Sequence, residues 1–361
     1  MAPITIALDW TPNTNHTGFY VARSKGFYKD AGLEVQILSP HQDEYKTTPG
    51  SRLVDRSATF ACVPSESVIS YHTWPNAAKP KIVAVAALLQ SNQSAIVTLK
   101  SSGIERPAQL DCKKYASYAA RYESRIVQQM IRADGGSGDY VETTPPMLGI
   151  WNTLLEGAAD ATWVFLPWEG VAAQRAGIPL NTFKLEDFGI PYCYSPVLAA
   201  HPNTLASQPG TVRSFLAATA KGYEWAAAHP KEAAALLCAE VAADAAAPNG
   251  KPLPEALDPE MVAQSQEAVA AAYLNTSSSS SSSGGGGSSV WGVMDLSVWE
   301  KFLDWLSDEG LLTSKAQSRS EGEHSSSLDG MRSGDAGERL LRDAVAAADL
   351  ATNAYLPAAQ Y

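Results

Sequence analysis

The stretch that decides the fold lies at the start of the chain, ITIALDWTPNTNHTGFYVARSKGFYKDAGLEVQIL at residues 4–38. Apolar runs over 4–8 and 33–38 are typical of two buried strands. Between them, residues 11–17 are rich in Pro, Asn and Thr and predict a loop, and residues 18–25 predict a helix. Because a helix connects the two strands, they form a βαβ unit and run parallel to each other.

The same alternation of strands and helices continues along the chain and predicts an α/β protein. Further strands are expected at 58–63, 81–89, 95–99, 115–119, 161–165, 183–185 and 194–199. Helices are expected at 65–72, 122–133, 147–156, 171–176, 210–229, 230–243 and 258–273. A chain of 361 residues is long enough for two lobes. We expect residues 1–90 plus 193–361 to form the first lobe and residues 91–192 to form the second.

Two segments interrupt this pattern. Residues 277–289 contain only Ser and Gly, and residues 314–338 are polar and rich in both. Such segments bury too little apolar surface to offset the entropy of ordering them, so we expect disordered insertions within the first lobe. Between them, residues 290–312 carry Trp, Phe and Leu at helical spacing and predict an amphipathic helix. The insertions are therefore interpreted as loops within the fold rather than domain boundaries.

The bulk composition excludes several classes of partner. The formal net charge of −11 disfavours nucleic acid and anionic membrane surfaces, although a local pocket can still carry the opposite sign. No stretch approaches the ~18 apolar residues of a membrane span, and the first residues lack the features of a leader. We therefore expect a cytoplasmic protein without a membrane segment, although a chain whose leader had been removed would read the same. A homodimer is left open.

The four cysteines are too widely spaced to predict a disulfide framework or a zinc site, so no metal site is expected. Familiar catalytic motifs of hydrolases, metalloproteases and nucleotide-binding proteins are also missing from the sequence. The run of four glycines at 284–287 is interpreted as part of a linker, not as a phosphate-binding loop.

The opening segment LDWTPNTNHTGFYVARSKGFYKDAGLEVQI, at 8–37, resembles the thiamine-pyrimidine (hydroxymethylpyrimidine phosphate) synthases and the related pyrimidine-precursor-binding proteins of ABC importers. Three later segments resemble the same family, in the same order: WVFLPWEGV at 163–171, WGVMDLSVWEKFLDWL at 291–306 and TNAYLP at 352–357. The resemblance implies a type II periplasmic-binding-protein fold, with two α/β lobes and a ligand cleft between them. It also implies a small heteroaromatic ligand.

Four candidate ligand-binding residues lie in the loop after the first predicted strand, where open α/β sheets bind their ligands. Trp10 offers a flat face for stacking, although a core Trp is the alternative. Asp9 offers a carboxylate to an exocyclic amine or a ring N–H, or else caps the loop. Asn13 and His16 belong to the same loop. A single His such as His16 binds a ligand phosphate or hydroxyl less often than it serves as a local structural partner.

Two further places are expected to face the cleft. Ser65 and Glu66 open a predicted helix, whose free N–H groups favour an anion, although a helix cap alone also explains the serine. Arg121 and Tyr122 stand where the resemblance implies a Gly-rich phosphate turn. Arg121 suits a carboxylate or phosphate, or else a surface ion pair. The missing glycines count against a phosphorylated ligand.

The last candidates follow later strands. In the family that the chain resembles, a carboxylate near Trp168 and Glu169 meets the aminopyrimidine from the second lobe. A carboxylate in such an aromatic setting needs a partner or a raised pKa. Tyr192 lies near the second crossing between the lobes and is expected to line the cleft. Asp9, Trp10 and His16 would thus face Arg121 and Glu169 across it.

The resemblance also implies chemistry that this chain is not equipped for. The fungal synthases use a lysine that holds pyridoxal phosphate, a histidine one helical turn later and a cysteine cluster thought to hold iron. The matching stretch FACVPSESVISYHTW, at 60–74, has no lysine, and its only histidine, His72, lies beyond the matching position. In place of the cysteine cluster, GIPYCYSPV at 189–197 has Cys193 alone. A Schiff base needs an amine, and iron needs several ligands.

We therefore expect a protein that binds a pyrimidine-type thiamine precursor, with no catalytic residue and no cofactor. Two alternatives stay open. One is a 4-amino-5-hydroxymethyl-2-methylpyrimidine phosphate synthase, for which pyridoxal phosphate and iron are the implied cofactors. The other is the solute-binding component of an ABC importer.

Overall fold

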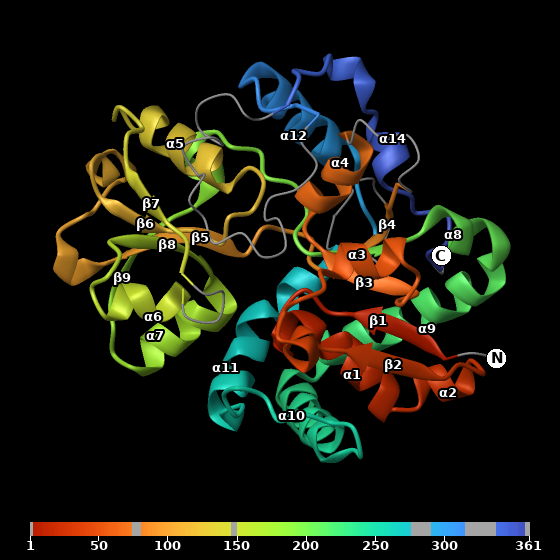
Figure 1. Ribbon diagram of the computed structural model, residues 1–361. Coiled ribbons are helices and arrows are strands. Elements are labelled where there is room, and N and C mark those ends of the chain that lie inside the picture. Colours follow the sequence, from red (N-terminus) through yellow and green to blue (C-terminus); the bar gives the residue numbers. More distant parts are fainter. Residues whose placement is uncertain (1–2, 74–80, 146–149, 276–289, 315–336, 358–361) are drawn as a thin grey trace, which may run out of the picture.

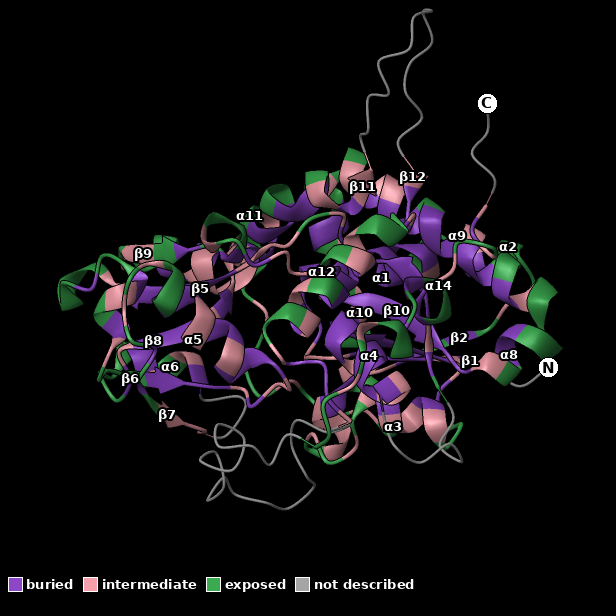
Figure 2. Ribbon diagram, turned by 90° about the horizontal axis from the view of Figure 1, so that it is seen from above, coloured by how far each residue is buried: buried purple, intermediate pink, exposed green. Residues whose placement is uncertain are grey.

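The computed structural model describes residues 3–73, 81–145, 150–275, 290–314 and 337–357. Two five-stranded sheets lie side by side, each with its own helices (Figure 1). The sheets have the strand orders β2-β1-β3-β10-β4 and β7-β6-β8-β5-β9. Buried residues gather in the inner strands of both sheets, and exposed residues lie mainly on the outer helices and loops (Figure 2). The expected α/β class is confirmed.

The first sheet consists of β1 (Ile4–Ala7), β2 (Val35–Leu38), β3 (Phe60–Val63), β4 (Val83–Ala87) and β10 (Val197–Ala200). β1 is parallel to both β2 and β3, so the predicted βαβ unit is confirmed. β10 returns late in the chain and lies antiparallel between β3 and β4. Since β1 lies between β2 and β3, the loop that follows its carboxyl end starts inside the sheet rather than at its edge.

The second sheet consists of β5 (Ser94–Leu99), β6 (Lys114–Ala116), β7 (Val141–Thr143), β8 (Ala161–Phe165) and β9 (Leu180–Phe183). β6 is parallel to β7 and β8, whereas β5 is antiparallel to β8 and β9. The chain changes sheet twice, between β4 and β5 and between β9 and β10. The lobe limits expected at residues 90 and 193 fall within these two connections.

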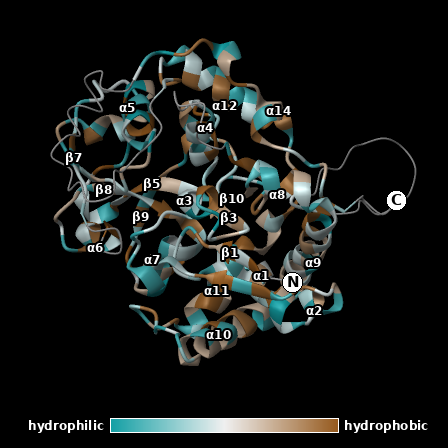
Figure 3. Cartoon of the chain, turned by 45° about the vertical axis from the view of Figure 1, so that its right-hand side comes forward, coloured by the Kyte–Doolittle hydropathy of each residue, from teal (hydrophilic) through white to brown (hydrophobic). Residues whose placement is uncertain are grey.

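The helices cover both sheets. They are α1 (Thr17–Ser24), α2 (Phe27–Asp30), α3 (Pro49–Val54), α4 (Ser65–Thr73), α5 (Glu123–Ala133), α6 (Ile150–Leu155), α7 (Val171–Arg175), α8 (Pro202–Ser207), α9 (Pro209–Ala228), α10 (Pro230–Ala246), α11 (Pro259–Val269), α12 (Leu296–Asp308) and α14 (Ala347–Leu350). α5 carries hydrophilic and hydrophobic residues on different sides (Figure 3), and its Ile126, Val127 and Met130 are buried. α1 and α9 pack closely because a Cβ on Gly222 would lie 2.1 Å from the Gly18 carbonyl oxygen.

The helix predicted over 290–312 begins later than expected. Val290–Trp291 forms the short strand β12, which pairs antiparallel with β11 (Leu274–Asn275). α12 then begins at Leu296, after the Asp295 carboxylate accepts the Ser297 N–H at 2.8 Å. Trp291 is buried beside the first sheet, so its apolar character reflects strand pairing rather than helix periodicity.

The two expected insertions lie almost wholly outside the described residues, which resume at Val290 and Gly337. Their neighbouring residues pair with each other: Leu274 lies opposite Trp291, and the Ser314 N–H donates to the Glu338 carbonyl at 2.8 Å. Both segments therefore leave and rejoin the fold at one place each. Among the described residues, we find no helix with the length and apolar character needed to cross a bilayer.

Candidate functional site

The loop that leaves the carboxyl end of β1 carries four of the predicted site residues. Asn13 caps the short 3-10 helix η1 (Thr14–His16): its Oδ1 accepts the Asn15 N–H at 2.9 Å, and its own N–H donates to His16 Nδ1 at 3.2 Å. The buried His16 ring lies with Nε2 2.8 Å from the Asp9 carboxylate. Because Nδ1 accepts a backbone N–H, the proton of the neutral imidazole is on Nε2 and is donated to Asp9.

Asn13 and His16 therefore hold the loop together, and their predicted contact with a ligand stays a prediction. Asp9 is partly exposed, with a quarter of its side-chain surface open to solvent. Helices from far along the chain also anchor this loop. Ser265 of α11 shares a 2.7 Å hydrogen bond with Thr14, and the Tyr223 hydroxyl of α9 donates to the Asn15 carbonyl at 2.7 Å. The loop that carries Asp9 is thus held by hydrogen bonds to α9 and α11.

The structure also brings a cysteine to the Asp9–His16 pair. Asp9, His16 and Cys62 of β3 each offer a ligand atom within 4.8 Å of the others. Metal binding would need a lone pair on His16 Nε2, but the Asn13 N–H on Nδ1 keeps the proton there. Burial and the Asp9 charge also raise the pKa of the Cys62 thiol, which disfavours a thiolate ligand. A hydrogen-bonded Asp–His pair explains these contacts better than a metal centre.

Trp10 is where the two lobes meet. Its half-buried indole makes edge contacts with Tyr45, at 5.4 Å between ring centroids, and with Tyr118, at 5.8 Å. Tyr45 lies in the loop after β2 of the first sheet, whereas Tyr118 follows β6 of the second sheet. We call Trp10, Tyr45 and Tyr118 the aromatic cluster. It supplies flat apolar faces from both lobes at one place.

Sequence analysis missed Tyr45. Its hydroxyl accepts the Thr11 N–H at 3.2 Å, which ties it to the β1 loop. Glu44 and Tyr45 both adopt left-handed backbone conformations, with φ of 60°. Such a conformation costs a residue with a side chain on the order of 1 kcal/mol, and this kind of strain gathers at functional sites. No glycine or asparagine marks the turn, so the sequence carried no signal for it.

Glu169 approaches the aromatic cluster from the second lobe. It lies on a π-helical turn, η6 (Leu166–Gly170), and its Oε2 accepts the Phe165 N–H at 3.0 Å. Burial raises the pKa of Glu169 to about 7, and its charge in turn helps to raise the pKa of Tyr118. The carboxyl group of Glu169 is therefore close enough to Tyr118 to act on it electrostatically. Its neighbour Trp168 packs against the apolar core of the first lobe.

Ser65 and Glu66 lie at the start of α4, and both are buried. The Ser65 N–H donates to the Tyr194 carbonyl at 3.2 Å, so it is not presented to an anion. Burial, followed by the nearby Glu123, raises the pKa of Glu66 to about 8. The Tyr192 hydroxyl is hydrogen-bonded to Glu66, and its ring lies 5.5 Å from that of Trp163. Glu66 and Tyr192 thus join α4 to the connection between the lobes.

Arg121 does not stand free in the cleft. Its Nη1 donates to Ser70 at 3.0 Å and Thr73 at 2.7 Å, both on α4 of the first lobe, and its Nη2 donates to the Thr313 carbonyl at 2.6 Å. The guanidinium also lies 4.8 Å from the ring centroid of the buried Tyr122. Arg121 therefore ties the lobes together, and an anionic ligand would have to compete with three protein acceptors for it.

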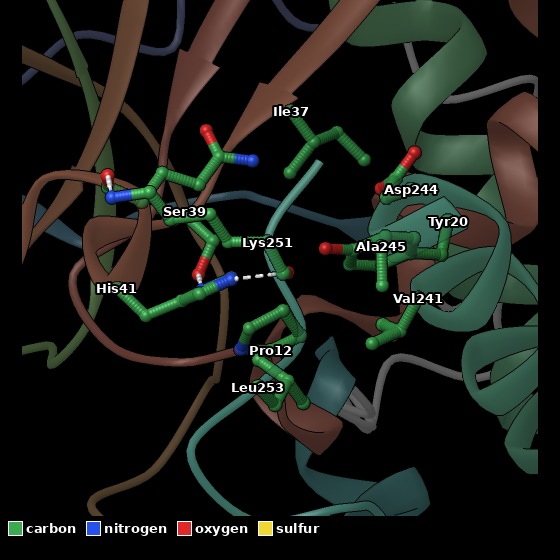
Figure 4. A pocket seen from close by; sticks show the side chains of 11 residues that line it. Pro12, Tyr20, Ile37, Ser39, His41, Val241, Asp244, Ala245, Lys251 and Leu253 are labelled. Carbon is green, nitrogen blue, oxygen red and sulfur yellow. Dashed lines mark hydrogen bonds between the residues drawn. The ribbon is translucent and has the colours of Figure 1, made fainter. Parts of the chain in front are cut away.

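Among the described residues, two hollows lie away from the aromatic cluster. Figure 4 shows one in the first lobe, about 10 Å³ in volume, where His41 Nε2 donates to the Lys251 carbonyl at 3.0 Å. It has room for one water. A larger groove of about 470 Å³ lies beside η6 and α7, with Ala268 of α11 on its wall. The aromatic cluster lines neither of these hollows.

Solved structures share this two-lobed architecture. The alkanesulfonate-binding protein SsuA of Xanthomonas axonopodis pv. citri superposes with a TM-score of 0.61 at 12% identity, covering 87% of this chain and 96% of that one. The periplasmic nitrate-binding protein NrtA of Synechocystis PCC 6803 superposes with a TM-score of 0.56 at 14% identity, covering 95% and 87%. The molecule therefore has the periplasmic-binding-protein fold, as expected.

A family profile described as NMT1/THI5 like matches residues 13–233, which is more than half of the chain. The chain belongs to the NMT1/THI5-like family. A formylaminopyrimidine-binding protein of Halalkalibacterium halodurans is 25% identical over 234 residues, covering 64% of this chain and 68% of the relative. A 4-amino-5-hydroxymethyl-2-methylpyrimidine phosphate synthase of Legionella pneumophila is 25% identical over 242 residues, covering 65% and 72%.

The described residues do not suit the cofactors that a synthase would imply. A Schiff base to pyridoxal phosphate needs a recessed lysine, but every lysine that the structure describes is exposed, and α4 has none. Cys193 is buried, and burial raises the pKa of its thiol, so it is a poor iron ligand. No chemical step through either group follows from these residues.

Proposed function

We propose that this protein binds a small, flat pyrimidine that carries an amino group, a precursor of thiamine, between its two lobes. The observation that supports this most directly is the aromatic cluster, in which Trp10 of the first lobe touches Tyr118 of the second. Asp9 adjoins Trp10 in the chain, and Glu169 acts electrostatically on Tyr118. An aminopyrimidine has the flat face and the N–H groups that such a surface would recognise.

Closure would be part of binding. Trp10 and Tyr118 touch in this arrangement, so a ring can only come between them when the lobes move apart. A ligand that then contacts both lobes favours the closed state by the free energy of those contacts. The named relatives fit this proposal, because one binds formylaminopyrimidine and others are named for an aminopyrimidine product.

A binding role is favoured over catalysis because the exposed lysines and the buried Cys193 supply none of the synthase chemistry. The cytoplasmic location expected from the sequence gains no support, because NrtA and the SsuA of Escherichia coli, which share the fold, are periplasmic proteins. The binding component of an importer is therefore a closer alternative than a cytoplasmic synthase. Rescue of a pyrimidine auxotroph by this chain would instead favour the synthase.

Native mass spectrometry of the freshly purified protein tests the proposal, followed by calorimetry with formylaminopyrimidine and 4-amino-5-hydroxymethyl-2-methylpyrimidine. We expect a copurified or added aminopyrimidine to bind, and Trp10→Ala and Glu169→Ala each to weaken it about tenfold or more, roughly 1.4 kcal/mol. Absence of binding by folded protein would overturn the proposal. Unchanged affinity in both variants would remove the site.

A further inference from the structure

The loop between β6 and α5 borders the aromatic cluster and is built like an anion site. Residues 117–120 lead from a strand into an 11-residue helix, and such turns gather backbone N–H groups where a phosphate commonly binds. Ala119 has a φ of 55°, a left-handed conformation that lets successive N–H groups converge. Tyr118, which touches Trp10, belongs to this loop. A ligand that stacks on Trp10 would therefore lie next to the loop that carries these N–H groups.

A carboxylate of the chain itself already occupies these donors. Glu123 Oε1 accepts the Tyr118 N–H at 3.1 Å, and Oε2 accepts the Ala120 N–H at 3.1 Å. The Tyr115 hydroxyl donates to Oε1 at 2.7 Å as a third bond. Glu123 is only 2% exposed, so its carboxyl group lies inside the loop, where a bound anion would otherwise accept these N–H groups. Burial raises the pKa of Glu123 to about 7, and the hydrogen bonds from Tyr115, Ala120 and Tyr118 oppose that rise.

The two remaining N–H groups of the loop are also satisfied. The Ser117 N–H donates to the Thr143 carbonyl at 2.8 Å, and the Ala119 N–H donates to Ser117 Oγ at 2.9 Å. The nearby ionisable groups are acidic: Glu66 acts on Glu123 from the first lobe and Glu169 acts on Tyr118, and burial raises their pKa values to about 8 and about 7. The guanidinium of Arg121 already donates hydrogen bonds to Ser70, Thr73 and Thr313. A phosphate would therefore meet backbone N–H groups that already have acceptors.

We propose that the carboxyl group of Glu123 fills the anion position of this loop and makes the cleft select unphosphorylated aminopyrimidines over their phosphate esters. This selection rests on the proposed function, since it concerns the ligand of the same cleft. Glu123 holds the loop from inside and is a specificity-determining residue rather than a catalytic one. Its removal should open a phosphate site that the wild-type protein lacks.

Calorimetry with 4-amino-5-hydroxymethyl-2-methylpyrimidine and with its phosphate ester tests the selection. The wild-type protein should bind the unphosphorylated compound about tenfold tighter or more. Glu123→Ala vacates the Tyr118 and Ala120 N–H groups, so its affinity for the phosphate ester should rise about tenfold or more. Glu123→Gln keeps an acceptor oxygen but removes the charge, and it should show a smaller gain. Glu186→Gln, an exposed change of equal charge in the same lobe, should show none.

The outcomes separate the two proposals. If the wild-type protein binds neither compound, the proposed function fails and the selection fails with it. If it binds both with equal affinity, the function stands and the selection is overturned. Retained binding of the unphosphorylated compound by Glu123→Ala, without any gain for the ester, also overturns it. Where Glu123→Ala does not fold, a gain in Glu123→Gln supports the selection, and a gain no larger than that of Glu186→Gln overturns it.

Discussion

His16 donates its Nε2 proton to the Asp9 carboxylate across 2.8 Å, and the Asn13 N–H on Nδ1 excludes the other neutral tautomer. The direction of this bond gives His16 and Asp9 different roles, although the sequence placed both in one loop as candidate ligand-binding residues. His16 is buried and orients the carboxylate, while Asp9 keeps part of its surface open to solvent. The hydrogen-bonding geometry that a ligand would meet at Asp9 therefore depends on a residue that has no exposed surface of its own.

Replacing this buried ring should affect both binding and stability. His16→Ala frees the Asp9 carboxylate to rotate and removes two buried hydrogen bonds, so aminopyrimidine affinity should fall about tenfold. The free energy of unfolding should fall by about 1–3 kcal/mol. Calorimetry and urea unfolding measure these effects, with the exposed His229→Ala as control. If the folded His16→Ala protein binds with unchanged affinity, then ligand binding does not require His16 to orient Asp9.

Arg121 should hold the lobes together even without a ligand. Arg121→Met removes the bonds to Ser70, Thr73 and Thr313, so the protein in solution should open and its radius of gyration by small-angle X-ray scattering should increase. Arg175→Met is the matched control. Arg175 also bridges the lobes, but to the exposed carboxylates of Asp258 and Glu260, and such surface pairs contribute little. Equal effects of the two changes would contradict a special role for Arg121.

Local sequence patterns predicted the first sheet better than the second. The run over 4–38 contains a whole βαβ unit, so its apolar strands and the helix between them were visible together. β7 was missed because its residues Val141–Thr143 are only three and all partly exposed, which leaves no apolar alternation. β9 ends at Phe183, where the predicted strand began, since Leu185 is buried in a short 3-10 helix instead.

At the site, residue type was predictable but orientation was not. Trp10 and Glu169 follow strands, and their side chains suggested a flat, polar ligand before the structure brought them near Tyr118. For Arg121, the sequence left open an anion-binding role or a surface ion pair, because its acceptor Thr313 lies 192 residues away in the chain. A guanidinium suits a ligand phosphate and a distant backbone carbonyl equally well, and only the packing of the two lobes decides between them.

Glu66 should make stability depend on pH. Its pKa rises from an ordinary 4.5 to about 8 on burial, so between these values the folded protein binds a proton that the unfolded chain has lost. The free energy of unfolding should therefore fall as the pH rises from about 5 to 8, by at most about 1.4 kcal/mol per pH unit from this group. Glu66→Gln cannot ionise, so relative to wild type it should gain stability as the pH rises.

Urea unfolding of both proteins at pH 5, 7 and 9 measures this difference. Glu169, whose pKa is raised to about 7, is present in both proteins and adds a similar slope to each. Curves of stability against pH that run parallel would contradict a buried, protonated Glu66 in the folded protein. Curves that separate below pH 5 instead would place its ionisation at the ordinary pKa of a carboxyl.

Tyr45 offers a test of whether the aromatic cluster binds through its rings. Tyr45→Phe keeps the ring against Trp10 and loses only the hydroxyl that accepts the Thr11 N–H, so ligand affinity should change about twofold or less. Tyr45→Ala removes the ring and leaves the Trp10 indole without one of its supports. Since an aromatic pair contributes about 0.5–1.5 kcal/mol beyond burial, affinity should fall about three- to tenfold. Calorimetry with an unphosphorylated aminopyrimidine measures both. If Tyr45→Phe weakens binding as much as Tyr45→Ala, then Tyr45 contributes by holding the Thr11 backbone through its hydroxyl. In that case only Trp10 and Tyr118 supply the stacking surface.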